Sequence, residues 1–185
     1  MLNTTATIIR IQDLLERWRS MGSRRLRNGT ELLAAIPDGD QQAWMHVVFA
    51  GESEADLDQL EGELGKPLPK RLRTFYRGCG GMTLFQGAFM LHGIRRPGFC
   101  EGDGSLQPES LVELNHSLDM AGWLPECAVA FAANGWDGSV YVLGMGHTDE
   151  QVVRCDRQTG DITERHRDVF SCVEARLYRL DEMSM

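Results

Sequence analysis

The cysteine and histidine residues are the side chains with which this chain could bind a metal or attack a substrate. Structural zinc sites usually begin with two cysteines roughly two to four residues apart, whereas the closest two of the five cysteines here are Cys155 and Cys172. The histidines show no spacing of four residues that would bring two of them to one helix face. The G-x-S-x-G motif of serine hydrolases is also missing from the sequence. These patterns predict no metal, no other cofactor and no catalytic centre.

Two glycine-rich segments could in principle bind a phosphate or a cation. Gly78-Cys79-Gly80-Gly81 follows a predicted helix, whereas a phosphate-binding loop follows a strand and opens a helix. We therefore interpret it as a turn that lets a helix pack closely on a sheet. Glu101-Gly102-Asp103-Gly104 offers oxygen ligands, but too few for an EF-hand loop. We expect a surface loop there.

The segment Asn134-Gly135-Trp136-Asp137-Gly138 has the composition of a binding loop. A tryptophan in a hairpin loop offers a large contact area and an N–H donor, and an aspartate can pair with a cationic group of a partner. We therefore take Asn134, Trp136, Asp137 and the nearby Tyr141 as the candidate binding residues. In the alternative interpretation, Trp136 folds back and covers the edge of the sheet.

The composition is that of an acidic globular protein. Hydrophobic residues make up 42% of the 185 residues, charged residues make up 25%, and the net charge is −8. A field of this sign repels nucleic acid and suits a cationic partner. Arginines crowd the N-terminal region, but Trp18 is the one aromatic residue among them, so we expect a solvated face there rather than a nucleic-acid-binding arm.

The sequence shows no apolar stretch of the length that a signal peptide or a membrane span requires. We therefore expect a cytoplasmic protein with reduced cysteines and no membrane partner.

The N-terminal region, residues 1–50, is predicted to form an extension of a helix and a strand packed on the main domain. Apolar residues at three- and four-residue spacing predict a helix that ends near Met21-Gly22. The segment from Glu31 to Ile36 looks like one short helical turn stopped by Pro37. Trp44 to Phe49 is rich in β-branched and aromatic residues and is predicted to be a strand.

Residues 51–185 are predicted to form the main domain, which opens with two helices. Ser53 followed three residues later by Asp56 is a capping-box pattern, and Gly65 is expected to end the first helix. Pro69 suits the start of the second helix. The predicted core residues of the pair are Leu57, Leu60, Leu64, Leu72 and Phe75.

Beyond this helix pair the pattern changes mainly to strands. Short strands are expected at Thr83–Phe85 and Ala88–Ile94, a helix at Glu109–Met120, and two hairpins after it. The hairpin strands are Ala128–Ala132 with Ser139–Leu143 and Gln151–Asp156 with Asp161–Arg165. A helix from about Phe170, with Asp168 as its cap, closes the chain. This order predicts an α+β fold with a largely antiparallel, twisted sheet and helices packed on it.

The order of motifs after residue 51 resembles the Smi1/Knr4 domain of the SUKH superfamily. That domain has a glutamate in an acidic helix, a glycine, a Leu-Pro pair, an aromatic-bearing helix and a Gly-Gly turn. The matching residues here are Glu61, Gly65, Leu68-Pro69, Phe75-Tyr76 and Gly80-Gly81. Later matches are Gly138, Tyr141 and Leu143 in a strand, Val152-Val153, Asp156 and Gly160 in the last hairpin, and Phe170 to Leu177 in the closing helix. The resemblance covers roughly Glu52 to Leu180.

This resemblance implies a binding domain without catalytic chemistry, in a family that includes bacterial immunity proteins that neutralise a cognate toxin. We therefore predict a non-enzymatic bacterial protein that binds a protein partner, such as a basic toxin whose active surface it masks. The alternative is a regulatory domain that binds a small ligand or a host protein. An enzyme with a cysteine or carboxylate site is a third class.

Overall fold

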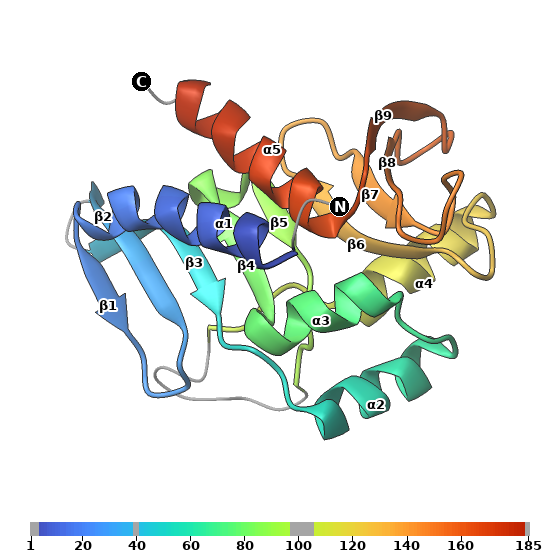
Figure 1. Cartoon of the computed structure of the whole chain (residues 1–185), viewed down its shortest axis with the longest axis horizontal. Helices are drawn as coiled ribbons and strands as arrows, with labels where there is room; N and C mark the ends of the chain where they lie inside the picture. Colours follow the sequence, from blue (N-terminus) through green and yellow to red (C-terminus); the bar gives the residue numbers. More distant parts are fainter. Residues whose placement is uncertain (1–3, 39–40, 97–105, 184–185) are drawn as a thin grey trace.

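The computed structural model describes residues 4–38, 41–96 and 106–183, and within them it shows five α-helices and one nine-stranded sheet (Figure 1). The strands follow one another across the sheet in chain order, from β1 to β9, and every neighbouring pair is antiparallel. The predicted α+β class is confirmed. The predicted loop at Glu101–Gly104 lies outside the described residues.

The N-terminal region contributes one helix and three strands to this fold. These are α1 (Thr4–Arg19), β1 (Ser23–Arg25), β2 (Glu31–Asp38) and β3 (Gln41–Phe49). The predicted helical turn from Glu31 to Ile36 is wrong, because this segment is the first part of β2. Its backbone pairs with β3 from Glu31↔Val48 to Asp38↔Gln41, and this long pairing outweighs the weak helical preference of a short segment.

The two helices after residue 51 are confirmed with their predicted ends. In α2 (Glu54–Leu64), the Ser53 side chain accepts a hydrogen bond from the Asp56 backbone, the Asp56 carboxylate accepts one from the Ser53 backbone, and Gly65 ends the helix with φ 70°. The second helix is α3 (Lys70–Gly78). Leu57, Leu60, Leu72 and Phe75 are buried in one cluster, and Leu64 packs against it half-buried.

The remaining elements follow the predicted order. They are β4 (Gly81–Leu84), the 3-10 turn η1 (Phe85–Gly87), β5 (Phe89–Leu91), α4 (Leu111–Ala121), β6 (Val129–Asn134), β7 (Val140–Leu143), β8 (Val152–Cys155), β9 (Ile162–His166) and α5 (Val169–Met183). Asp168 caps α5, because its carboxylate accepts a hydrogen bond from the Ser171 backbone at 2.8 Å. The predicted hairpins are therefore β6–β7 and β8–β9.

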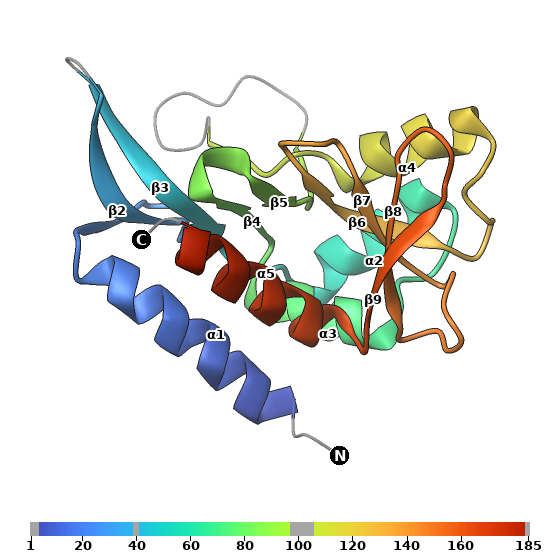
Figure 2. The same ribbon diagram turned by 90° about the horizontal axis from the view of Figure 1, so that it is seen from above.

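Helices cover the second half of the sheet on both faces. Figure 2 shows β6, β7 and β8 between α5 on one side and α4 on the other. Tyr141 and Leu143 of β7 belong to the larger core, with α1, α3 and α5. The intervening Val140 and Val142 belong to a second core under α4. This alternation follows from the two-residue period of a strand, and it fixes which β7 side chains face which helix.

Candidate binding site

The β6–β7 hairpin loop has a backbone shaped by its own side chains. The Asn134 Oδ1 atom accepts a hydrogen bond from the Trp136 backbone at 3.0 Å, and the Asn134 carbonyl accepts one from the Gly138 backbone at 2.9 Å. Gly135 donates to the Ala88 carbonyl at 3.1 Å, and a Cβ atom on it would lie 2.1 Å from the Gly87 carbonyl oxygen. A glycine is therefore required where the loop crosses the β4–β5 turn.

This local geometry leaves the Trp136 side chain in solvent. Trp136 is 62% exposed, which is far more than is usual for the largest apolar side chain. It does not cover the sheet edge, as the alternative interpretation required. The indole is therefore accessible at the surface of the protein.

Asp137 is held by a network that connects the hairpin loop to β8 and β9. Its carboxylate accepts a hydrogen bond from the Ser139 backbone at 2.9 Å and forms an ion pair with Arg154 of β8. Arg154 also donates to the Ser139 hydroxyl at 2.8 Å and lies 3.5 Å from Glu164 of β9. Partial burial opposes the charged form of Asp137, but the bonds from Ser139 and Arg154 outweigh it and hold the pKa of the carboxyl below its usual value.

Arg154 and Glu164 were not among the sequence-based candidates. The register brings them there, since Tyr141 lies opposite Arg154 in β7–β8 and Arg154 lies opposite Glu164 in β8–β9. Residues that face each other across antiparallel strands lie on the same face of the sheet. The sequence spacing of the two predicted hairpins places Tyr141, Arg154 and Glu164 opposite one another only when the strand registers are also known.

The other two candidates, Asn134 and Tyr141, lie inside the protein. Asn134 is 3% exposed and shapes the loop, and Tyr141 is fully buried with its ring edge-on to Phe89 at 5.3 Å. The Arg176 guanidinium of α5 lies 5.7 Å from the Tyr141 ring centre. Burial raises the pKa of the Tyr141 hydroxyl. The structure thus brings the four candidates to one hairpin, with Trp136 and Asp137 on its surface and Asn134 and Tyr141 beneath.

Three of the thiols are poorly suited to nucleophilic chemistry. Burial raises the pKa of Cys79 to about 12 and that of Cys155 to about 11, and it also raises the pKa of Cys172. The thiolate is the attacking form of a cysteine, so these three side chains are weak nucleophiles near neutral pH. Cys127 is exposed, and Cys79, Cys127, Cys155 and Cys172 are all free thiols.

Two features are missing from the described residues. In that part of the chain, no three His, Cys, Asp or Glu side chains gather closely enough to hold a metal ion. None of the described helices combines the length and hydrophobicity that crossing a bilayer requires.

The fold and the hairpin together define an α+β protein that presents an exposed tryptophan and an ion-paired aspartate at one end of an antiparallel sheet. The chain belongs to the SMI1 / KNR4 family (SUKH-1), whose model matches residues 51–171. The match thus includes the helix pair, both hairpins and the loop that carries Trp136. No curated protein sequence matches the chain.

Proposed function

We propose that the protein is a non-enzymatic bacterial binding protein, and specifically an immunity protein that neutralises a toxin by covering its active surface in the cytoplasm. Family membership supports this proposal, because proteins of this type occur in the family. The candidate contact surface is the β6–β7 hairpin loop with Asn134, Trp136, Asp137 and Tyr141. Trp136 makes the contact, Asp137 meets a cationic group, and the two buried residues hold the loop in shape.

The observation that carries the proposal is the exposure of Trp136 on an ordered loop. Interface hot spots are enriched in tryptophan, and a loop whose backbone is fixed before binding loses little conformational entropy on association. The loop is fixed by the hydrogen bonds of Asn134 and Asp137. The net charge of −8 favours a basic partner and would speed its association.

Replacing Trp136 with Ala tests the contact surface. The partner in the test is a candidate toxin, to be taken from the genes next to that of this protein. We expect the dissociation constant to rise at least fivefold, which corresponds to about 1 kcal/mol, the lower range for a buried aromatic anchor. The melting temperature should change little, because the indole is 62% exposed in the free protein. Calorimetry and thermal unfolding of the same variant give both quantities.

Tyr178→Ala is the matched control, because Tyr178 is another exposed aromatic residue, 48% exposed and on α5. It should leave the affinity unchanged. Raising the salt concentration should slow association with a basic toxin, because salt screens the charges that attract it. A Trp136→Ala protein that melts lower but binds as tightly would refute the assigned surface. Turnover of a substrate by the purified protein would refute the binding function.

A further inference from the structure

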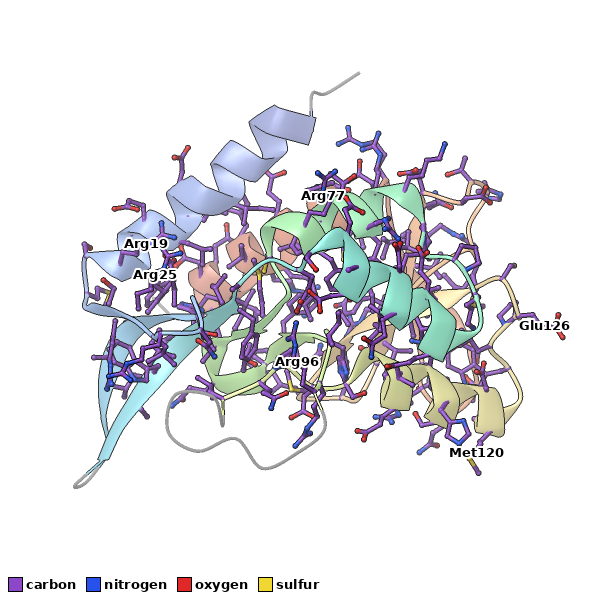
Figure 3. The ribbon with its side chains drawn as sticks, turned by 90° about the horizontal axis from the view of Figure 1, so that it is seen from below. Arg19, Arg25, Arg77, Arg96, Met120 and Glu126 are labelled. Carbon is purple, nitrogen blue, oxygen red and sulfur yellow. The ribbon has the colours of Figure 1, made fainter. Side chains whose placement is uncertain are left out.

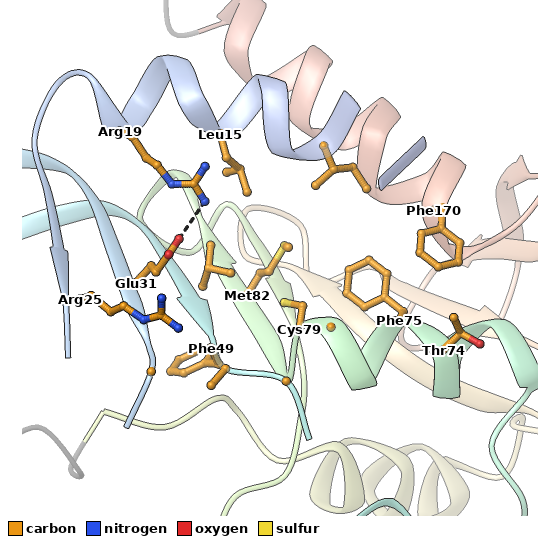
Figure 4. A pocket seen from close by; sticks show the side chains of 16 residues that line it. Leu15, Arg19, Arg25, Glu31, Phe49, Thr74, Phe75, Cys79, Met82 and Phe170 are labelled. Carbon is orange, nitrogen blue, oxygen red and sulfur yellow. Dashed lines mark hydrogen bonds and ion pairs between the residues drawn. The ribbon is translucent and has the colours of Figure 1, made fainter. Parts of the chain in front are cut away.

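A cavity of about 320 Å³ lies away from the hairpin, where the N-terminal elements meet α3, β4 and α5 (Figure 4). Its apolar lining comes from segments far apart in the sequence. The residues are Ile11 and Leu15 of α1, Phe49 of β3, Phe75 of α3, Met82 of β4 and Phe170 of α5. All six are at least nine-tenths buried. The interior of the cavity is therefore suited to a hydrocarbon group.

Charged side chains line one side of this cavity. Arg19 and Glu31 form an ion pair at 2.8 Å, drawn as a dashed line in Figure 4. Arg25 of β1 lies beside them, and Figure 3 shows Arg19 and Arg25 close together at this end of the molecule. Arg25 is exposed, as are Thr74 and Gly78 of α3, which also line the cavity. The cavity thus reaches the surface beside Arg25 and along α3.

Arg25 is the second cation of this lining, and the first, Arg19, pairs with both Glu16 and Glu31. Glu31 lies opposite Arg25 in the β1–β2 register, but its carboxylate binds Arg19. Within the described residues, the Arg25 side chain has no ion pair or hydrogen bond. The lining therefore carries one guanidinium that is free to bind an anion, at the rim of an apolar interior.

We propose that this cavity binds a small amphipathic monocarboxylate, with the carboxylate on Arg25 and the hydrocarbon part among Leu15, Phe75 and Met82. A guanidinium offers parallel N–H donors that match the two oxygens of a carboxylate. The binding site is separate from the hairpin loop and does not depend on the identity of the protein partner.

The volume sets the size of the ligand. A water molecule occupies about 30 Å³ in the liquid, so a cavity of about 320 Å³ holds roughly ten non-hydrogen atoms. Octanoate has about this size, with a linear chain that can follow the cavity and a single negative charge. It is therefore the probe for the experiment. Octanol and octylammonium have nearly the same hydrocarbon part with no charge or with the opposite charge.

Titration calorimetry of the full chain with these three compounds tests the charge preference. We expect octanoate to bind with one-to-one stoichiometry, octanol to bind at least fivefold more weakly, and octylammonium to bind more weakly still because it faces Arg25. Octanoate should also raise the melting temperature, and further as its concentration rises above the dissociation constant, since a ligand that binds only the folded state stabilises it.

Arg25→Gln tests the carboxylate contact. We expect octanoate to bind about fivefold more weakly, the size typical of a solvent-exposed ion pair. The variant should bind octanol as the wild type does. Arg24→Gln is the matched control, because Arg24 is the neighbouring residue of β1 and its side chain points to the opposite face of the strand. It should leave octanoate binding unchanged.

Gly78→Leu tests the location of the site. Gly78 lines the cavity, and a Cβ atom on it would meet nothing within 4 Å apart from its chain neighbours and the backbone of its own helix. A leucine there should therefore fill the cavity entrance without strain and abolish octanoate binding while the melting temperature is kept. Three results would overturn the proposal: no octanoate binding at millimolar concentration, equal binding of octanoate and octanol, or unchanged octanoate binding by the folded Gly78→Leu protein.

Discussion

At the scale of single residues, His46 shows how a polar side chain is kept neutral in the core. It is fully buried, and its ring lies 4.8 Å from Trp18 and 4.5 Å from Phe85, centre to centre. The Phe85 backbone donates a hydrogen bond to His46 Nδ1 at 3.3 Å, so this nitrogen carries no proton. Burial lowers the pKa of His46 to about 4, against an ordinary value of 6.5. The neutral imidazole of β3 thus packs as an aromatic ring against Trp18 of α1 and Phe85 of η1.

His46 makes the free energy of unfolding depend on pH. Because its pKa is lower in the folded state, the unfolded chain takes up the proton first as the pH falls below 6.5. The stabilising contribution is complete above that pH and is lost as the pH falls toward about 4. Each pH unit within this window costs about 1.4 kcal/mol. Urea unfolding at about pH 7.5 and pH 5.5 should thus show a decrease of roughly 1 kcal/mol from this residue.

His46→Asn removes the titrating group and keeps an acceptor in place of Nδ1. Its loss of stability between these two pH values should be smaller than that of the wild type by roughly 1 kcal/mol. Burial also lowers the pKa of His92 and His166, but these residues titrate in both proteins and cancel in the difference. Equal pH dependence in the two proteins would mean that His46 is protonated inside the fold or reached by water.

At the scale of elements, the helix pair α2–α3 is determined by the signals at its helix ends and by the Leu68-Pro69 corner between the two helices. The Ser53 capping box starts α2, Gly65 ends it, and the Glu61 carboxylate accepts a hydrogen bond from the Leu68 backbone at 2.9 Å. Arg73 of α3 pairs with Glu61 at 3.0 Å. One glutamate thus connects the helix, the Leu-Pro corner and the next helix, and it turns the apolar faces of both helices to the same side.

Leu60→Ala tests the packing of this pair. Leu60 is 2% exposed, so its truncation should lower the free energy of unfolding by roughly 2–5 kcal/mol, the loss expected for a buried leucine that leaves a cavity. Leu64→Ala is the control, since Leu64 is only half-buried on the same face and should cost less. Denaturant unfolding measures both. A loss below about half a kcal/mol at Leu60 would contradict its place in the core.

Most elements could be predicted because their signals are local. The caps of α2 and α5, the apolar spacing of α1, and the turn residues of both hairpins lie within a few residues of the elements they define. The segment from Glu31 to Ile36 was misassigned because its structure is set by β3, through pairs that include Leu33↔His46. In the candidate site and the cavity, too, the features set by local sequence could be predicted and those set by distant contacts could not. The exposed loop with Trp136 was predictable, whereas Arg154 and the cavity depend on strand register and on contacts between distant segments.

At the scale of the whole molecule, the N-terminal extension and the region matched by the family form one continuous sheet. β3 pairs with β4 through Val47↔Thr83, Val48↔Met82 and Phe49↔Gly81. Arg17 of α1 forms an ion pair with Asp181 of α5 at 2.7 Å, and Figures 1 and 2 show these two helices side by side. The apolar core likewise contains residues of α1 and β2 together with those of α3 and α5. Residues 1–50 and 51–185 should therefore unfold together.

The variant Leu33→Ala tests this cooperativity. Leu33 of β2 is fully buried in the shared core, so the substitution should cost roughly 2–5 kcal/mol. Trp18 and Trp44 report on the N-terminal part, and Trp123 and Trp136 on the rest. Tryptophan fluorescence and far-ultraviolet circular dichroism should give one coincident transition in the wild type, and both midpoints should fall by the same amount in the variant.

A protein in which only part of the tryptophan signal shifts, while the remaining transition keeps its midpoint, would show that the extension unfolds as a separate unit. In that case the cavity between α1 and α3 would open before the family domain unfolds, and octanoate would stabilise only the first of the two transitions.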